Sequence, residues 1–501
     1  MSPWRPGLLC LHDMGWIHSA RSMTSEPIGS PDRLRWVVER LLLWAQEAAS
    51  GAWFDDGSPF EIPEFATSDA KAPPFLYLED SITYREWTPH IGKFGVFDIH
   101  SWGRSYLLGK FRHAKDGVLN SPAWSSAAGR PVSLGIWALI PHVPVISPWK
   151  APMTGAELDA MLGAYGLSFD VLVKSRGFRD ALKSGTIIFA IGFPVPQRHG
   201  DAPDRIAWRV IVEKPAMHRS VRRHPVPNFS TLKDWWSRAD RRVSWQPTEN
   251  ASLSRFESRG LLNASFRGRR VALIGCGSLG SQLAETLVRG GVASLILIDS
   301  QDFAVANLVR HTLTSTGLGT SKAEALSARL ATISPTCRIE TLRCDVQQAM
   351  SRLEDAEVVV DATGSDDAQA TLARHIGKTP RWFVSMSFTA GVTRGYLSLH
   401  YGTNFDAETL SIGWAESGSA LGPISSEHDL PREDVGCWHE VFPARNSQVA
   451  LMGNMLIEDA QREMARMGSG TALLVRYHQG LDHVAGAEDW RLWAWHPSHG
   501  G

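Results

Sequence analysis

The 501-residue sequence is poor in cysteine and lacks the cysteine arrangements of disulfide-rich or zinc-binding proteins. Only five cysteines are present, and no two of them form a C-x-x-C pair. A disulfide framework and a four-cysteine zinc site are therefore excluded. We expect a reducing compartment, the cytoplasm.

Long apolar runs and an excess of one charge are also missing. The apolar segments are shorter than a membrane span requires, and the N-terminal "MSPWRPGLLCLHDMGW" lacks the apolar core and cleavage site of a signal peptide. Lysine and arginine total 51 against 52 acidic residues, so the overall charge favours neither nucleic-acid nor membrane binding. A chain of this length has room for roughly two to four domains.

Three regions with different patterns follow one another along the chain. In the first, residues 1–65, apolar side chains at helical spacing predict a helix over residues 32–49. In residues 75–250, "SYLLGKF", "VSLGIWALI", "TIIFAIGF" and "IAWRVIVE" predict strands and "TGAELDAMLGAYG" predicts a helix, which indicates an α+β domain. From residue 251 to the C-terminus, alternating strand and helix patterns predict an α/β domain with a doubly wound, Rossmann-like sheet.

The segment "RRVALIGCGSLGSQLAETLVRGGVASLILIDSQDF" carries the clearest functional signal. An apolar strand runs into Gly275, Gly277 and Gly280, and a helical pattern follows. Glycines at this spacing let a phosphate approach the backbone N–H groups at the start of the helix. A second strand ends at Asp299, nineteen residues after the last glycine, where a carboxylate can accept hydrogen bonds from a ribose. The segment therefore predicts a nucleotide site.

Four further residues indicate which nucleotide binds. Asn307 and Arg310 in "NLVRH" would face the same way on a helix, Lys322 follows, and Asp361 ends the strand "EVVVD". A triphosphate with magnesium can use two cations and a metal-binding carboxylate, whereas a dinucleotide has little need of them. We therefore predict ATP and Mg²⁺, with Asp361 as the metal ligand. An NAD-dependent oxidoreductase built on the same glycine loop is the alternative.

In these residues the region from about 255 onward resembles the adenylation domain of ubiquitin-activating enzymes and the related ThiF and MoeB proteins. The family pattern is a glycine loop, a ribose acid, Asn-x-x-Arg, a lysine and a magnesium aspartate. The matching positions are Gly275, Gly277, Gly280, Asp299, Asn307, Arg310, Lys322 and Asp361. "NLVRH" departs slightly from the usual Asn-Leu-Asn-Arg-Gln.

The resemblance implies a reaction and an assembly. The C-terminal carboxylate of a partner protein, usually on a glycine, attacks the α-phosphate of ATP, and Arg310 stabilises the departing pyrophosphate. Such domains work as homodimers, and Arg255 or Arg259 would enter the site of the partner subunit.

Cys437 is the first candidate for carrying the activated acyl group. In "EDVGCWHEVF" it precedes a helical pattern, the position of the crossing loop that supplies the acceptor cysteine in ubiquitin-activating enzymes. A small buried residue is the alternative. Cys276, Cys337 and Cys344 are expected to be structural.

Cys10 is the second candidate. The order "LLCLHDMGW" and then the helix over residues 32–49 resembles the active-site region of ubiquitin-conjugating enzymes over about 60 residues. The strands that precede the cysteine in that family are not in this sequence. We therefore interpret residues 1–65 as a truncated conjugating-enzyme-like segment with Cys10 as its nucleophile, a core cysteine being the alternative. Residues 1–30 should be poorly ordered, and the helix should bury its apolar stripe on the middle domain or remain loosely held.

A conjugating segment followed by an adenylation domain resembles the fused enzymes of bacterial antiphage systems. Those enzymes conjugate the C-terminus of a nucleotidyltransferase or of a ubiquitin-like protein to a target. The expected partner is therefore a protein with a glycine-type C-terminal tail. A sulfur-carrier adenylyltransferase of cofactor biosynthesis and an inactive scaffold are further alternatives.

Overall fold

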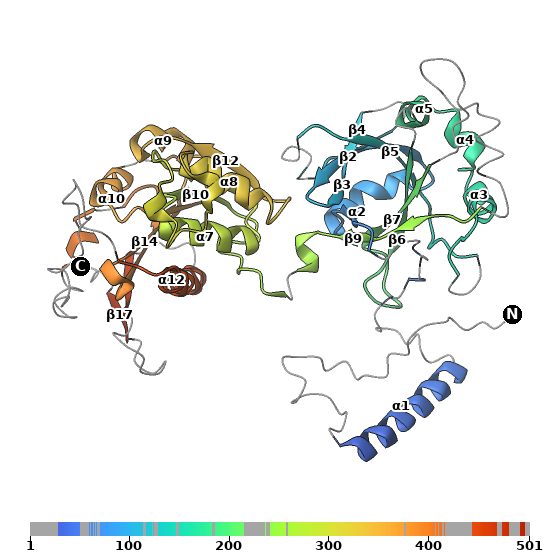
Figure 1. Cartoon of the computed structure of the whole chain (residues 1–501), viewed down its shortest axis with the longest axis horizontal. Helices are drawn as coiled ribbons and strands as arrows, with labels where there is room; N and C mark the ends of the chain where they lie inside the picture. Colours follow the sequence, from blue (N-terminus) through green and yellow to red (C-terminus); the bar gives the residue numbers. More distant parts are fainter. Residues whose placement is uncertain are drawn as a thin grey trace. The chain divides into compact units, whose positions relative to one another are not determined.

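The computed structural model divides the chain into two units, Met1–Pro122 with Arg130–Ser252 and Ala123–Gly129 with Leu253–Gly501 (Figure 1). It describes residues 29–50, 60, 62–63, 65, 67, 71–113, 117–122, 124, 129–146, 150–182, 186–214, 236, 241–256, 259–374, 377–405, 407–408, 410–412, 415, 443–467, 473–479 and 491–495. No helix within those ranges is long and apolar enough to cross a membrane.

The predicted first helix is confirmed as α1 (Ser30–Ser50). Its apolar stripe is exposed, with Leu34 at 68%, Val38 at 48% and Leu41 at 42%. Of the two outcomes expected for this stripe, burial on the middle domain is not found among the described residues, and a loosely held helix stays a prediction.

The N-terminal unit is built on one mixed sheet. Its strands are β1 (Phe75–Tyr77), β2 (Phe94–Trp102), β3 (Ser105–His113), β4 (Val118–Asn120), β5 (Ser133–Leu139), β6 (Ile187–Val195), β7 (Arg205–Glu213), β8 (Trp245–Gln246) and β9 (Thr248–Asn250). They lie in the order β8-β7-β6-β5-β2-β3-β1-β9, with β4 beside β3. The four segments predicted as strands are found as β3, β5, β6 and β7.

Helices cover both faces of this sheet. On one face α3 (Gly155–Ala164), α4 (Phe169–Val173) and α5 (Arg176–Leu182) close a core around Phe169 and Phe189. On the other, α2 (Ser81–Trp87) packs Trp87 among the aromatic rings of Phe111, Trp137 and Trp208.

The C-terminal unit contains the predicted doubly wound sheet. Its strands are β10 (Arg270–Ile274), β11 (Ser294–Ile298), β12 (Arg338–Leu342), β13 (Val358–Asp361), β14 (Arg381–Phe388), β15 (Arg394–Gly402), β16 (Leu473–Gln479) and β17 (Arg491–Trp495). Strands β12-β11-β10-β13-β14 are parallel, and β15, β16 and β17 continue the sheet in antiparallel pairs.

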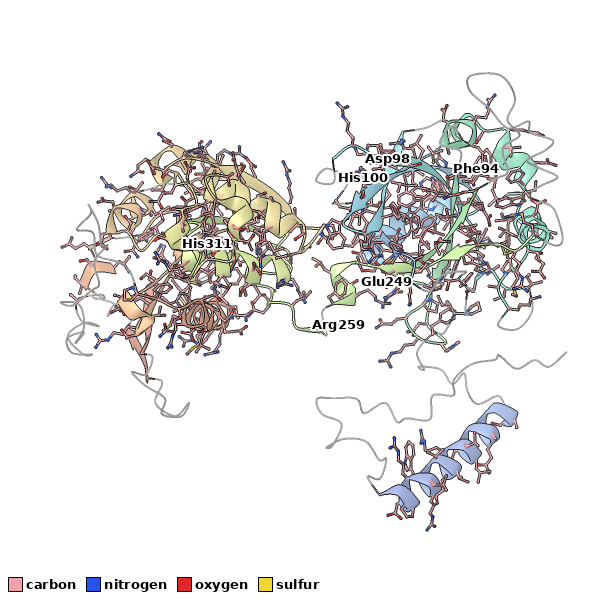
Figure 2. All side chains as sticks on the ribbon, in the orientation of Figure 1. Phe94, Asp98, His100, Glu249, Arg259 and His311 are labelled. Carbon is pink, nitrogen blue, oxygen red and sulfur yellow. The ribbon has the colours of Figure 1, made fainter. Side chains whose placement is uncertain are left out.

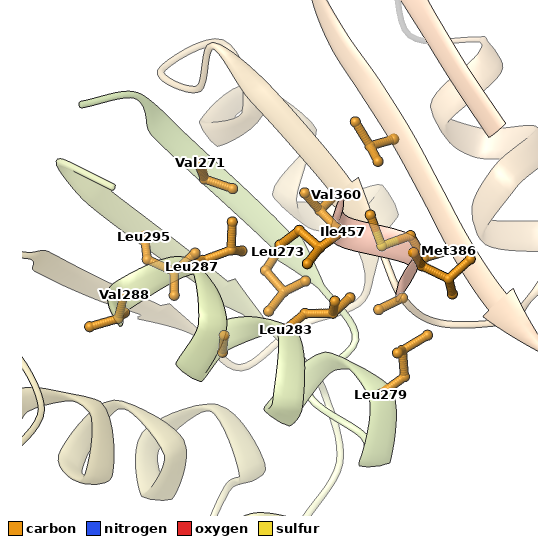
Figure 3. Close-up of a cluster of buried hydrophobic side chains, with 14 of the residues drawn as sticks. Val271, Leu273, Leu279, Leu283, Leu287, Val288, Leu295, Val360, Met386 and Ile457 are labelled. Carbon is orange, nitrogen blue, oxygen red and sulfur yellow. The ribbon is translucent and has the colours of Figure 1, made fainter. Parts of the chain in front are cut away.

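Two hydrophobic cores lie on the two faces of this sheet. Helices α7 (Ser278–Arg289), α8 (Lys322–Ala331) and α12 (Asn446–Met467) cover one face, where Leu279, Leu283 and Leu287 of α7 meet the strand residues Val271 and Leu273 (Figure 3). Helices α9 (Val346–Leu353) and α10 (Asp366–Ala373) cover the other. The α7 leucines are four residues apart, close to the 3.6-residue period of an α-helix, which explains why one side of that helix is buried.

Candidate nucleotide-binding site

The glycine loop lies at the carboxyl end of β10, the middle strand of the parallel part of the sheet. Gly275 has φ +86°, and a Cβ at Gly280 would lie 1.8 Å from the carbonyl oxygen of Gly275. Gly275 requires glycine because its φ lies in the left-handed region, and Gly280 requires it because the first turn of α7 packs directly on the loop. Gly277 is the N-cap of α7 and supplies no side-chain hydrogen bond, and a Cβ there would meet open space. The first N–H groups of the helix are thus open to an anion.

A cleft of about 430 Å³ opens beside this loop. Strand β10 has β11 on one side and β13 on the other, so the crevice lies where the strand order reverses, as in other doubly wound nucleotide-binding sheets. Lining residues come from the ends of four strands and the helices that follow them: Ile274, Gly275, Gly277, Ile298, Asp299, Ser300, Gln301, Cys344, Asp345, Val346, Gln347, Ala362, Thr363, Ser365, Asp367 and Ala368.

Asp299 lies in this cleft at the end of β11, as predicted. Its Oδ2 accepts the N–H of Cys276 at 2.7 Å, and its Oδ1 accepts the N–H of Gln301 at 2.8 Å. The carboxylate thereby ties the glycine loop to the end of the neighbouring strand. Its remaining lone pairs are available to ribose hydroxyls.

Lys322 is the first residue of α8 and is only 7% exposed. Its Nζ donates to Oε1 of Gln301 at 2.7 Å. Gln301 in turn donates its N–H to Asp299, which accepts the N–H of Cys276, so hydrogen bonds connect Lys322 through Gln301 and Asp299 to the glycine loop.

The Asn-x-x-Arg segment does not form the α-helix expected for it. Asn307 ends a 3-10 helix (η6, Val305–Asn307), and its side chain accepts the N–H of Ala304 at 3.2 Å. The Asn307 side chain thus satisfies the backbone N–H at the start of a short turn. Local side-chain-to-backbone hydrogen bonds of this kind compete with the formation of a regular α-helix. Arg310 follows in the turn, and its carbonyl oxygen accepts from Nδ2 of Asn446 at the start of α12 at 3.4 Å.

Asp361 ends β13 as predicted, but it is 3% exposed and does not line the cleft. Its Oδ1 accepts from the N–H and the hydroxyl of Thr363, and its Oδ2 accepts from the hydroxyl of Ser385. Burial raises the pKa of this carboxyl above its usual value. Its role as a magnesium ligand stays a prediction. Asp345 and Asp367 are exposed carboxylates that do line the cleft.

His311 is a site residue that the sequence reasoning missed. Its Nδ1 accepts the N–H of Leu313 at 3.1 Å, so its Nε2 carries the proton donated to the carbonyl oxygen of Cys276 at 2.7 Å. Burial lowers the pKa of this imidazole to about 4, so the ring is neutral near pH 7. The ring packs against Phe303 inside the C-terminal unit (Figure 2). The only signal in the sequence was the histidine at the end of "NLVRH".

Three of the five cysteines, Cys276, Cys337 and Cys344, lie among the residues that the structure describes. Cys276 and Cys337 are buried, and burial raises the pKa of both thiols, that of Cys337 to about 12. Cys344 is partly buried, and its thiol pKa is also raised by burial. All three thiols are thus protonated near pH 7, in keeping with a structural role. Cys10 and Cys437 lie outside the described residues.

Arg255 and Arg259 are the two arginines predicted to enter the site of the partner subunit. Arg255 ends the 3-10 helix η4 (Leu253–Arg255), and Arg259 follows it; both are exposed. Within the described part of the chain, no three histidine, cysteine or acidic side chains are grouped so that they could hold a metal ion.

Comparison with known proteins shows what two regions of the chain are similar to. Residues 249–392 match the ThiF family, and residues 51–251 match the Cap2 central linker domain. The "ATP-dependent ubiquitin transferase-like protein Cap2" of Enterobacter hormaechei is 28% identical over 469 residues, covering 89% of this chain and 77% of that protein. The protein of the same name from Pseudomonas aeruginosa is 32% identical over 115 residues, 22% of this chain and 21% of that protein.

Among solved structures, Escherichia coli MccB with ATP matches with a TM-score of 0.31 and 10% identity, covering 46% of this chain and 64% of that chain. The sequence matches confirm the predicted likeness to the ThiF family, and the predicted class of enzyme agrees with the names of the curated relatives.

Proposed function

We propose that this chain, a ThiF family domain joined to a Cap2-type central linker domain, is an ATP-dependent enzyme that adenylates the C-terminal carboxylate of a partner protein. One observation carries the proposal. Open helix N–H groups and the Asp299 carboxylate lie in one cleft at the switch point of the sheet, and the buried ammonium of Lys322 donates to the cleft residue Gln301. The name of the Enterobacter relative, an ATP-dependent ubiquitin transferase-like protein, supports it.

The chemistry follows from these groups. An oxygen of the partner's carboxylate forms a bond to the α-phosphorus of ATP, the bond from that phosphorus to the bridging oxygen breaks, and pyrophosphate leaves. The N–H groups after Gly277 bind phosphate oxygens, and Asp299 orients the ribose. Lys322 and Arg310 stabilise the negative charge that develops on pyrophosphate, which is where fixed cations lower the barrier most.

Magnesium would neutralise part of the charge on the triphosphate. Oxygen ligands suit this ion, and it commonly takes one or two carboxylates together with substrate phosphates. Asp361 is the carboxylate expected from the family pattern, but its oxygens already accept hydrogen bonds from the hydroxyls of Thr363 and Ser385. Asp367 is exposed and lines the cleft, which makes it the better-placed ligand of the two.

Transfer to a thiol is the proposed second step. The thiolate of Cys437 attacks the acyl carbon of the adenylate, a thioester forms and AMP leaves. Asn446, which contacts Arg310 in the site, is nine residues after Cys437. Nine residues of extended chain span up to about 30 Å, a length that would allow the thiol to reach the cleft.

The later steps follow the same logic. Cys10 would receive the acyl group from Cys437 and pass it to a target, as in the antiphage fusions that the sequence resembles. A protein with a glycine-type tail, either a ubiquitin-like protein or a nucleotidyltransferase, would be the substrate. Arg255 or Arg259, both exposed, would reach the partner subunit's cleft in a homodimer.

Exchange of labelled pyrophosphate into ATP tests the first step, using the full chain and a candidate partner protein encoded by a neighbouring gene. Lys322→Ala and Arg310→Ala should each lower exchange by roughly a hundredfold, because each removes a cation from the leaving group. Arg289→Ala, at the exposed end of α7, is the matched control and should leave exchange unchanged. Full exchange in the Lys322 variant would overturn the assignment.

A further inference from the structure

Two histidine rings of the N-terminal unit meet nitrogen to nitrogen. His90 ends the 3-10 helix η2 (Thr88–His90), and His113 ends β3. The Nε2 atom of His113 lies 3.0 Å from the Nδ1 atom of His90, and the two ring centroids are 5.0 Å apart. Both side chains are half-buried, so the pair is accessible from the surface. The proposed adenylation reaction makes no use of these two rings.

Hydrogen bonding determines which nitrogen of each ring carries a proton. Nδ1 of His113 lies 3.3 Å from the carbonyl oxygen of Phe94, the first residue of β2, and a carbonyl oxygen can only accept (Figure 2). A neutral His113 therefore has its proton on Nδ1 and a lone pair on Nε2. His90 supplies the proton between the two rings from its own Nδ1. The pair thus holds one proton where two lone pairs would otherwise face each other.

This arrangement has two features of a metal-binding pair. A metal-binding histidine usually donates its other ring N–H to a carbonyl or a carboxylate, which orients the ring, and His113 makes that bond to Phe94. A metal–nitrogen bond is about 2.1 Å long, so two nitrogens 3.0 Å apart would subtend an angle of about 90° at a shared ion. Adjacent ligands in octahedral and square-planar sites are separated by that angle.

The charge state of the pair also suits a metal, because a histidine must be neutral to bind one. Burial, followed by the charges of His113 and Lys93, lowers the pKa of His90, so its ring is neutral near pH 7. No third histidine, cysteine or acidic side chain completes the pair within the described part of the chain. Water would therefore fill the remaining positions. Ions that prefer oxygen ligands, such as Mg²⁺, would gain little from two imidazoles.

We propose that His90 and His113 form a two-histidine site for a divalent transition-metal ion such as Zn²⁺ or Ni²⁺, on the region that matches the Cap2 central linker domain. The ion takes the place of the proton between the rings, and each of the two facing nitrogens donates a lone pair to it. The displaced proton is taken up at Nε2 of His90, so both rings stay neutral. Binding would fasten η2 to the end of β3. The site shares no residue with the nucleotide cleft and does not depend on the proposed function.

The test measures Ni²⁺ binding to the full chain, made without a histidine tag, by calorimetry, and uses Mg²⁺ as the ion that should not bind at the pair. H90Q and H113Q each remove one imidazole and keep a polar side chain. H142Q is the matched control, because His142 is an exposed histidine of the same unit whose ring neighbours Tyr165. Thermal unfolding with and without Ni²⁺ shows that each variant is folded and gives a second measure of binding.

The wild-type chain should have a Ni²⁺ site that H90Q and H113Q each weaken by roughly tenfold or more, because a single imidazole loses the advantage of two ligands held together. H142Q should leave that site unchanged, and Ni²⁺ should raise the melting temperature of wild type more than that of H90Q. Equal Ni²⁺ affinities in wild type, H90Q and H113Q would overturn the proposal and leave a pair that only shares a proton. Should H113Q lose its folding transition, H90Q decides alone, since His90 ends a short helix at the surface.

Discussion

Replacing Glu79 by glutamine should remove a pH dependence from the stability of the N-terminal unit. Glu79 is 2% exposed. Its Oε1 accepts the indole N–H groups of Trp87 and Trp208, both at 2.9 Å, and its Oε2 accepts the hydroxyl of Thr83 at 2.6 Å. Burial raises the pKa of this carboxyl from 4.5 to about 8, against the opposing effect of the three hydrogen bonds.

The sign and size of the effect follow from proton linkage. Between pH 4.5 and 8 the folded unit keeps a proton that the unfolded chain has released, so the free energy of unfolding falls as pH rises through this window. At about 1.4 kcal/mol per pKa unit, the loss reaches an upper limit of about 5 kcal/mol above pH 8. Glutamine is neutral at every pH and can offer its carbonyl oxygen to both indoles and its NH₂ group to Thr83.

Urea unfolding followed by tryptophan fluorescence at pH 5, 7 and 9 measures this difference. Glu79→Gln should equal wild type near pH 5 and exceed it by several kcal/mol at pH 9. Glu249→Gln, at an exposed position on β9, is the control and should follow wild type throughout (Figure 2). A constant offset between Glu79→Gln and wild type at all three pH values would refute the reasoning.

Three other outcomes are expected. His311→Leu leaves the Cys276 carbonyl and the Leu313 N–H without partners, so the free energy of unfolding should fall by about 1–3 kcal/mol and the affinity for MgATP should fall with it. His311→Gln should lower both quantities less. Equal losses in both variants would contradict the role of His311 in holding the loop. Asp367→Asn should weaken the magnesium dependence of pyrophosphate exchange more than Asp366→Asn does, and the reverse order would exclude Asp367 as a ligand. With ATP and the correct partner protein, a thiol-sensitive adduct should appear on non-reducing gels and be absent in Cys437→Ala; an undiminished adduct would move the acceptor role to another cysteine.

Periodicity predicted the parts of the fold whose signals are local. The strand, glycine turn and helix over residues 270–289 follow directly from an apolar run, three glycines and leucines at helical spacing. The strands β3, β5, β6 and β7 were equally visible as apolar runs. Their order in the sheet was not, because pairing such as that of β1 with β9 joins segments more than 170 residues apart.

The sequence indicated candidate residues for the site, but not the hydrogen bonds that connect them. Asp299 and Lys322 were expected around a triphosphate, and they do gather at the glycine loop. Nothing in the sequence showed that Gln301 would hold Lys322, or that His311 would bond the loop, since both contacts depend on how segments fold back on one another. Asp361 was expected at the site because it ends β13. Its carboxylate instead accepts hydrogen bonds from the hydroxyls of Thr363 and Ser385, and no pattern in the sequence indicated these bonds.

Hydrogen exchange of the full chain with and without nucleotide tests the central claim most directly, since it needs no partner protein. The account predicts that MgATP slows amide exchange in the peptide covering Gly277 to Ser281 and in the one covering Asp299 to Gln301, and that NADH at the same concentration leaves both unchanged. Protection by NADH, or none by MgATP, would contradict an ATP-dependent enzyme and return the glycine loop to the oxidoreductase interpretation.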